Sequence, residues 1–218
     1  MENSIPSDHT IAIHPLAVRA WHWINAVAMA LMIGSGWRIY NASPLFGFTF
    51  PPGITLGGWL GGALQWHFAA MWLLMFNLLA YVIYGMVSGH FKSRFFPITV
   101  PALVSDIQSA LAGRLSHEQG VYNAVQRAFY LGVMGAIIAT ILSGLVIWKS
   151  TQFSTLGILF GGYEGARLVH FLGMCAIVAF IAVHLALVLI VPSTFLPMIT
   201  GSARKHTASD AMSNGDMP

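Results

Sequence analysis

Charged side chains are scarce in this sequence. Only 8% of its 218 residues are Asp, Glu, Lys or Arg, whereas 56% are hydrophobic. A soluble domain carries about a quarter charged residues, so this chain cannot face water on all sides, and membrane lipid is its natural solvent. The ten Lys and Arg residues occur singly or in pairs, which argues against a nucleic-acid partner.

Cysteine is almost absent, and so are the signals of secretion. Cys175 is the only cysteine, so the chain forms no internal disulfide, and it lacks the C-x-x-C-H motif of covalent haem attachment. The polar N-terminus contains Glu2 and Asp8 and lacks the basic start and cleavage site of a secretory signal. We therefore expect the first apolar segment to be retained as a helix.

Four apolar stretches approach or exceed the length of about 20 residues that a membrane-spanning helix needs. The predicted spans are about 17–39, 65–88, 126–148 and 167–191. Residues 41–65 are rich in Pro and Gly, which indicates a loop, with room for a short interfacial helix. The predicted fold class is therefore all-α, an integral membrane four-helix bundle. It forms one domain, 1–200, before a polar tail, 201–218, that we expect to be disordered.

The distribution of Lys and Arg predicts how the bundle is oriented. Seven of them lie in the N-terminal segment, the 89–127 loop and the C-terminal tail, and three lie on the other side. The positive-inside rule therefore places both termini in the cytoplasm. The segment 100–115 has a helical apolar pattern with isolated charges and is predicted to lie on the cytoplasmic interface.

An ionisable residue inside a membrane span is energetically costly and therefore marks a candidate functional site. Four of the nine histidines lie in or at the ends of spans: His22, His67, His170 and His184. His170 and His184 are 14 residues apart, which brings them within about 40° of one helix face. They are about 21 Å apart along the axis, too far to share a metal ion. This spacing favours two sites stacked across the bilayer.

Depth in the membrane gives each of these histidines a partner. His22 and His184 fall in the cytoplasmic half, whereas His67 and His170 open their spans from the outer side. Two imidazoles between apolar helices suit a haem whose iron takes one nitrogen from each side. Zinc would require more ligands, and no carboxylate or thiolate lies near either pair. Haem iron with two histidine ligands has no open coordination position for a substrate, so the expected chemistry is electron transfer.

Other interpretations of the histidines stay open at this point. A single histidine in a span can simply be packed and hydrogen-bonded, although four that pair by depth favour ligands. A proton-relay transporter usually carries intramembrane Asp or Glu, and the predicted spans contain neither. The other histidines fall outside the predicted spans: His9, His14, His90, His117 and His206.

Four motifs in order carry a family resemblance over about residues 10–200. R-x-x-H-W opens the first span, a single histidine opens the second, Y-N-x-x-Q precedes the third and H-x13-H lies in the fourth. This order resembles the bacterial cytochrome b561 and Ni,Fe-hydrogenase-type cytochrome b superfamily. The superfamily includes the membrane subunits of formate dehydrogenase (gamma) and of thiosulfate reductase-type enzymes.

The resemblance implies two haems b in the bacterial inner membrane. One would be ligated by His22 and His184, and the other by His67 and His170. It also implies a quinone site near the cytoplasmic haem, at Tyr122, Asn123 and Gln126. Helix capping and polar anchoring explain those three residues equally well.

Three arginines lie at levels that suit haem propionates: Arg19, Arg127 and Arg167. Positive-inside anchoring also explains the first two.

The function implied by the resemblance is electron transfer between a periplasmic oxidoreductase partner and the quinone pool. The chain would be an electron-transfer subunit rather than a self-contained enzyme. Residues 36–48 and 56–68 most resemble cytochrome b subunits encoded with periplasmic molybdopterin oxidoreductases. Two alternatives remain: a stand-alone cytochrome that oxidises superoxide and reduces quinone, and a haem-free membrane anchor or transporter.

Overall fold

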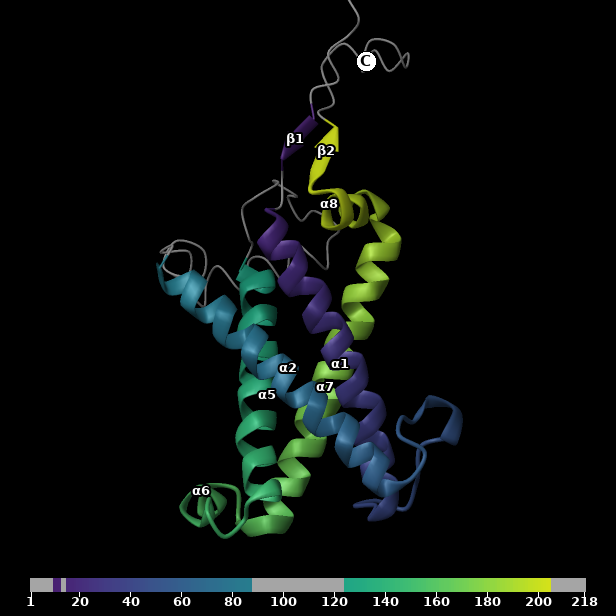
Figure 1. The fold of residues 1–218 in the computed structure, drawn as a ribbon, viewed down its shortest axis with the longest axis vertical. Helices are drawn as coiled ribbons and strands as arrows, with labels where there is room; N and C mark the ends of the chain where they lie inside the picture. Colours follow the sequence, from purple (N-terminus) through teal and green to yellow (C-terminus); the bar gives the residue numbers. More distant parts are fainter. Residues whose placement is uncertain (1–9, 13–14, 88–123, 205–218) are drawn as a thin grey trace, which may run out of the picture.

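Four long helices dominate the computed structural model, which describes residues 10–12, 15–87 and 124–204 (Figure 1). They are α1 (Leu16–Ala42), α2 (Leu60–Val87), α5 (Ala124–Trp148) and α7 (Gly162–Ile190). The predicted all-α class is therefore confirmed. The predicted interfacial segment at 100–115 lies outside the described residues.

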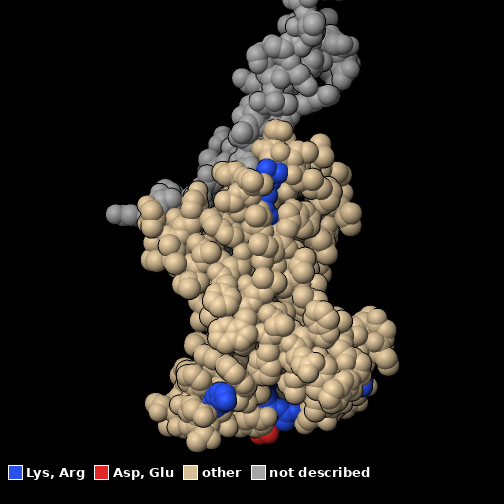
Figure 2. All heavy atoms as spheres, viewed as in Figure 1, with Lys and Arg blue, Asp and Glu red and all other residues tan. Residues whose placement is uncertain are grey.

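All four helices are long and apolar enough to cross a membrane. Figure 2 shows the charged side chains near the two ends of the molecule, with an uncharged band between them on the face in view. An uncharged band bounded by charges is the surface expected of a protein embedded in lipid.

The helices associate as two antiparallel pairs. Helix α1 packs closely against α2, and α5 against α7, whereas close backbone approaches between the two pairs are few. Within the first pair, the buried Asn77 donates its side-chain Nδ2–H to the Trp21 carbonyl at 3.1 Å and to Asn25 Oδ1 at 2.7 Å. Interhelical hydrogen bonds of this kind stabilise helix pairs in lipid.

One end of the bundle, here called the ribbon end, carries both ends of the described chain (Figure 1). Strand β1 (Thr10–Ala12) pairs with β2 (Ser202–Arg204), which follows the short helices η2 (Pro192–Thr194) and α8 (Phe195–Thr200). Trp23 donates its indole Nε1–H to the Met198 carbonyl at 3.1 Å. Strand β2 thus lies within the segment expected to be disordered, of which 205–218 is outside the described residues.

The opposite end, here called the loop end, contains the 43–59 connection and α6 (Ser154–Leu159). The connection includes the short helix η1 (Pro52–Ile54). It is held to α1 by two hydrogen bonds of 2.8 Å between the Asn41 side chain and the Phe50 backbone. A backbone bond of 2.9 Å from Leu56 N–H to the Gly34 carbonyl fixes it further along the helix.

Helix α2 begins at Leu60, earlier than the predicted span at 65, although its start is rich in glycine. Gly61 and Gly62 are helical; a Cβ atom at Gly61 would run into the Trp59 indole, and one at Gly62 would run into the Gly57 carbonyl oxygen. Gly61 therefore lets the Trp59 ring fold over the first turn of the helix, and Gly62 lets the preceding loop approach it. The glycines at the start of α2 are thus part of the helix, where they allow close packing, although glycine clusters are typical of loops.

Candidate functional site

The four span histidines meet as two facing pairs, each joining one helix pair to the other. His22 of α1 lies beside His184 of α7, with ring centroids 6.1 Å apart. His67 of α2 lies beside His170 of α7, with ring centroids 6.4 Å apart. We call these the ribbon-end pair and the loop-end pair. They are the pairs predicted from depth, and their ligation of haem stays a prediction.

The ring separations fit a metal ion placed between the imidazoles. Two imidazoles that ligate one ion from opposite sides, through nitrogens about 2.0 Å from the metal, have ring centroids about 6 Å apart. The rings of both pairs are tilted by 58° to one another, so neither pair is simply stacked. Among the described residues, no group of three or more His, Cys, Asp or Glu could hold a metal ion. Two ligands suffice for a haem, because the porphyrin supplies the other four nitrogens.

On α1, a serine and a glycine contact the His67 imidazole. The Ser35 hydroxyl oxygen lies 3.0 Å from His67 Nδ1. A Cβ atom at Gly36 would lie 3.5 Å from His67 Cε1, which is ordinary van der Waals contact. Nδ1 is thus engaged by α1, and Nε2 is the nitrogen left for a metal.

On α5, the same two residue types face His170. Its Nδ1 lies 2.9 Å from the Thr140 carbonyl oxygen and 3.4 Å from Ser143 Oγ. A Cβ atom at Gly144 would lie only 3.1 Å from His170 Cε1. The imidazole therefore fits here because residue 144 has no side chain.

Sequence reasoning missed Ser35, Ser143 and Gly144 as site residues. The available signal was a Ser–Gly dipeptide that occurs at 35–36 and again at 143–144, each time inside an apolar span. Of the glycines in the four spans, Gly36 also faces an imidazole, that of His67. Gly34 instead contacts Leu56 of the connection, and nothing lies within 4 Å of a Cβ at Gly132 or Gly135 among the described residues.

Aromatic rings accompany the ribbon-end pair. Phe180 stacks on His184 with ring centroids 6.2 Å apart and an interplanar angle of 8°. The Trp23 ring lies edge-on to His22 at 5.3 Å. His22 is half-buried and His184 is exposed, so this pair is the more open of the two.

Two of the three arginines predicted to contact haem propionates already donate hydrogen bonds to protein groups. Arg19 donates to the Ile199 carbonyl, and its Nε is buried with no hydrogen-bond partner in the described part of the chain. Arg167 donates to Glu164 Oε2 at 2.9 Å and to the Ser43 carbonyl at 2.5 Å. The side chains of Arg127 and Gln126, and the whole of Tyr122 and Asn123, lie outside what the structure describes.

Two buried N–H donors have no hydrogen-bond partner among the described residues. Arg19 Nε is on the residue one helical turn before His22, and Trp37 Nε1 follows Gly36, which faces His67. Buried donors are normally satisfied, so these two are suited to an acceptor group such as a carboxylate.

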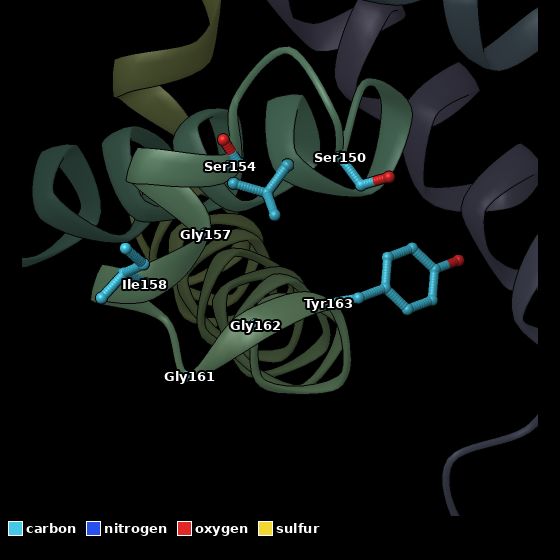
Figure 3. Close-up of a pocket in the computed structure, with 8 residues that line it drawn as sticks. Ser150, Ser154, Gly157, Ile158, Gly161, Gly162 and Tyr163 are labelled. Carbon is cyan, nitrogen blue, oxygen red and sulfur yellow. The ribbon is translucent and has the colours of Figure 1, made fainter.

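A separate cavity of about 430 Å³ opens at the loop end, where α6 meets the start of α7 (Figure 3). Its lining includes Ser150, Ser154 and Tyr163, and none of the four span histidines. It is therefore distinct from both pairs.

Comparison with known proteins identifies the relatives of this chain. Residues 13–201 match the family model described as prokaryotic cytochrome b561. The chain is 55% identical over 196 residues to the putative protein-methionine-sulfoxide reductase subunit YedZ1 of Azospira oryzae, covering 89% of this chain and 99% of that protein. It is 23% identical over 210 residues to the probable Ni/Fe-hydrogenase B-type cytochrome subunit of Azotobacter vinelandii, covering 85% and 83%.

A protein from Cupriavidus necator with the same description is 24% identical over 190 residues, covering 79% of this chain and 76% of that protein. The family match includes all four span histidines and confirms the resemblance predicted from the motifs. Cytochromes of this kind carry b-type haem. Since the matching family model covers most of the chain, the chain belongs to the prokaryotic cytochrome b561 family of multi-pass bacterial membrane haem proteins.

Proposed function

We propose that this chain is a di-haem b-type cytochrome that transfers electrons between a periplasmic oxidoreductase partner and the quinone pool. The observation that carries the proposal is the pair of facing imidazoles near each end of α7, with ring centroids 6.1 and 6.4 Å apart. Two centres about 21 Å apart along one helix could connect the two sides of a membrane.

Each histidine pair would hold one haem b. His22 and His184 would ligate one iron, and His67 and His170 the other. Haem b with two imidazole ligands supplies one-electron transfer and leaves no open position for a substrate. The engaged Nδ1 atoms of the loop-end pair support this assignment, because they leave Nε2 of both rings for a metal.

The partner that best fits the comparisons is a reductase acting on oxidised methionine. The relative that is 55% identical is described as a subunit of a putative protein-methionine-sulfoxide reductase, and the match spans 99% of its length. Reduction of a sulfoxide to a thioether and water consumes two electrons and two protons. A partner of this class would therefore draw electrons from quinol through this chain, whereas a hydrogenase partner would send them toward quinone.

A quinone site at the ribbon end is the remaining part of the proposal. It rests on the Y-N-x-x-Q motif, with Tyr122, Asn123 and Gln126 as hydrogen-bonding groups. Arg19, Arg127 and Arg167 are proposed to contact haem propionates. Arg19 Nε is buried with no hydrogen-bond partner among the described residues, and it supports the first of these, because it leaves, on the residue one helical turn before His22, a donor for an acidic group.

Haem stoichiometry tests the two sites. The purified wild-type chain should give a b-type difference spectrum and about two haems per chain, and His170→Ala and His184→Ala should each leave about one. His206→Ala, in the C-terminal tail, is the matched control and should keep the wild-type ratio. Absence of a b-type band would reject haem binding, and two haems in His170→Ala would reject the pairing.

Copurification tests the partner. An affinity-tagged chain solubilised in mild detergent should retain an oxidoreductase subunit, and reduced quinone should support sulfoxide reduction only when both proteins are present. A pure single chain that oxidises superoxide and reduces quinone without another subunit would instead establish a stand-alone enzyme.

A further inference from the structure

Both histidines of the loop-end pair rest on a buried serine hydroxyl from the neighbouring helix. Ser35 and Ser143 are 0% exposed. Ser35 Oγ lies 3.0 Å from His67 Nδ1, and Ser143 Oγ lies 3.4 Å from His170 Nδ1. In each case the next residue is the glycine that the imidazole faces.

The hydroxyl protons of these serines are already used within their own helices. Ser35 donates to the Leu31 carbonyl at 2.5 Å, with the Met32 carbonyl at 3.2 Å. Ser143 donates to the Ala139 carbonyl at 2.7 Å, with the Thr140 carbonyl at 3.1 Å. A hydroxyl has a single proton, so toward the imidazole each serine oxygen acts as an acceptor.

This arrangement determines where the imidazole protons lie. His67 Nδ1 donates, since its backbone partner is the Met32 carbonyl, which can only accept, and the Ser35 hydroxyl proton is engaged within its own helix. His170 Nδ1 must also donate, since its shortest contact is with the Thr140 carbonyl oxygen, 2.9 Å away. Both neutral rings therefore carry hydrogen on Nδ1 and present the lone pair of Nε2.

We propose that Ser35 and Ser143 are positioning residues that fix the tautomer and ring plane of His67 and His170 for a shared iron. The inference rests on the proposed haem ligation and adds a structural reason for it. A glycine lets each imidazole approach the helix, and the serine one residue earlier accepts its Nδ1–H. Acceptors on Nδ1–H raise the basicity of a ligating imidazole and so favour the ferric state of the iron.

The two serines should differ in how strongly they influence the loop-end haem. The distance from the serine Oγ to the histidine Nδ1 is 3.0 Å for Ser35 and 3.4 Å for Ser143. Each imidazole also has a backbone carbonyl partner, Met32 for His67 and Thr140 for His170. Loss of Ser35 should therefore perturb the loop-end haem more than loss of Ser143.

The test compares Ser35→Ala and Ser143→Ala by redox titration and by the electron paramagnetic resonance of the ferric haems, in the full chain. Ser154→Ala, at an exposed loop-end serine away from the histidines, is the matched control. Ser35→Thr keeps a hydroxyl and should restore wild-type behaviour. We expect both haems to be retained and one titration step to move to higher potential, more in Ser35→Ala than in Ser143→Ala. The control should not move.

Repeating the Ser35→Ala titration in a His184→Ala background, which keeps the loop-end pair, assigns the step that moves. Unchanged titration and resonance in variants that keep both haems would overturn this inference alone. A shift confined to the ribbon-end haem would also overturn it. Absence of a b-type band in the wild type would instead refute the proposed function. If Ser35→Ala does not fold, Ser143→Ala still decides the question.

Discussion

At the scale of single residues, the two glycines that face the loop-end pair differ in how closely the imidazoles approach. A Cβ atom would lie 3.1 Å from His170 Cε1 at position 144, but 3.5 Å from His67 Cε1 at position 36. Gly144→Ala should therefore displace His170, whereas Gly36→Ala should be tolerated. We expect haem loss from Gly144→Ala about tenfold faster than from wild type, at the lower end of what outer-shell changes cost metal sites.

Transfer of haem to excess apomyoglobin, followed by absorbance, measures this difference. Gly132→Ala is a suitable control, because nothing described lies within 4 Å of a Cβ there. Equal rates of haem loss from Gly144→Ala and Gly36→Ala would contradict this expectation, because the site of His170 would then accommodate an added methyl group.

At the scale of helices, the part-buried hydrogen bond between Asn77 and Asn25 joins α1 to α2. Asn77 donates both to Asn25 Oδ1 and to the Trp21 carbonyl, so Asn77→Ala should destabilise more than Asn25→Ala. A double-mutant cycle should give a coupling energy of about 1 kcal/mol, within the range of interhelical hydrogen bonds in membranes. Unfolding of the solubilised protein by increasing SDS in mixed micelles provides the measurement. A parallel cycle of Asn77→Ala with the distant Ser154→Ala should be additive, and a coupling near zero for the asparagine pair would contradict the expectation.

The helices also show what the sequence could and could not predict. Apolar runs bounded by charges predict four long helices, because lipid requires long uncharged segments with internally satisfied backbones. The sequence predicts the second span from about 65, whereas α2 begins at Leu60, because the packing of Gly61 against Trp59 and of Gly62 against the Gly57 carbonyl depends on how the preceding loop folds back. The roles of Ser35 and Ser143 depend on which helix lies opposite, and the periodicity of one helix does not contain that information.

At the scale of the whole molecule, the histidine pairs lie between two helix pairs that otherwise make few close backbone contacts. A planar group held by one histidine from each side would therefore join the two halves of the bundle. The same arrangement separates the ends of the protein. The ribbon end holds the described termini, and the loop end holds the 43–59 connection, α6 and the cavity.

The orientation of these ends decides which haem a periplasmic partner could approach. Seven of the ten Lys and Arg residues belong to the N-terminal segment, the 89–127 loop and the C-terminal tail, so the ribbon end should face the cytoplasm. With Cys175 replaced by Ala, a cysteine at Lys149 should react with a membrane-impermeant maleimide in intact spheroplasts. A cysteine at Thr200 should react only after permeabilisation, since both positions are exposed in the fold but lie at opposite ends. The reverse pattern would place the loop-end pair at the cytoplasmic side, and would require an oxidoreductase partner outside the membrane to exchange electrons at His22 and His184 instead.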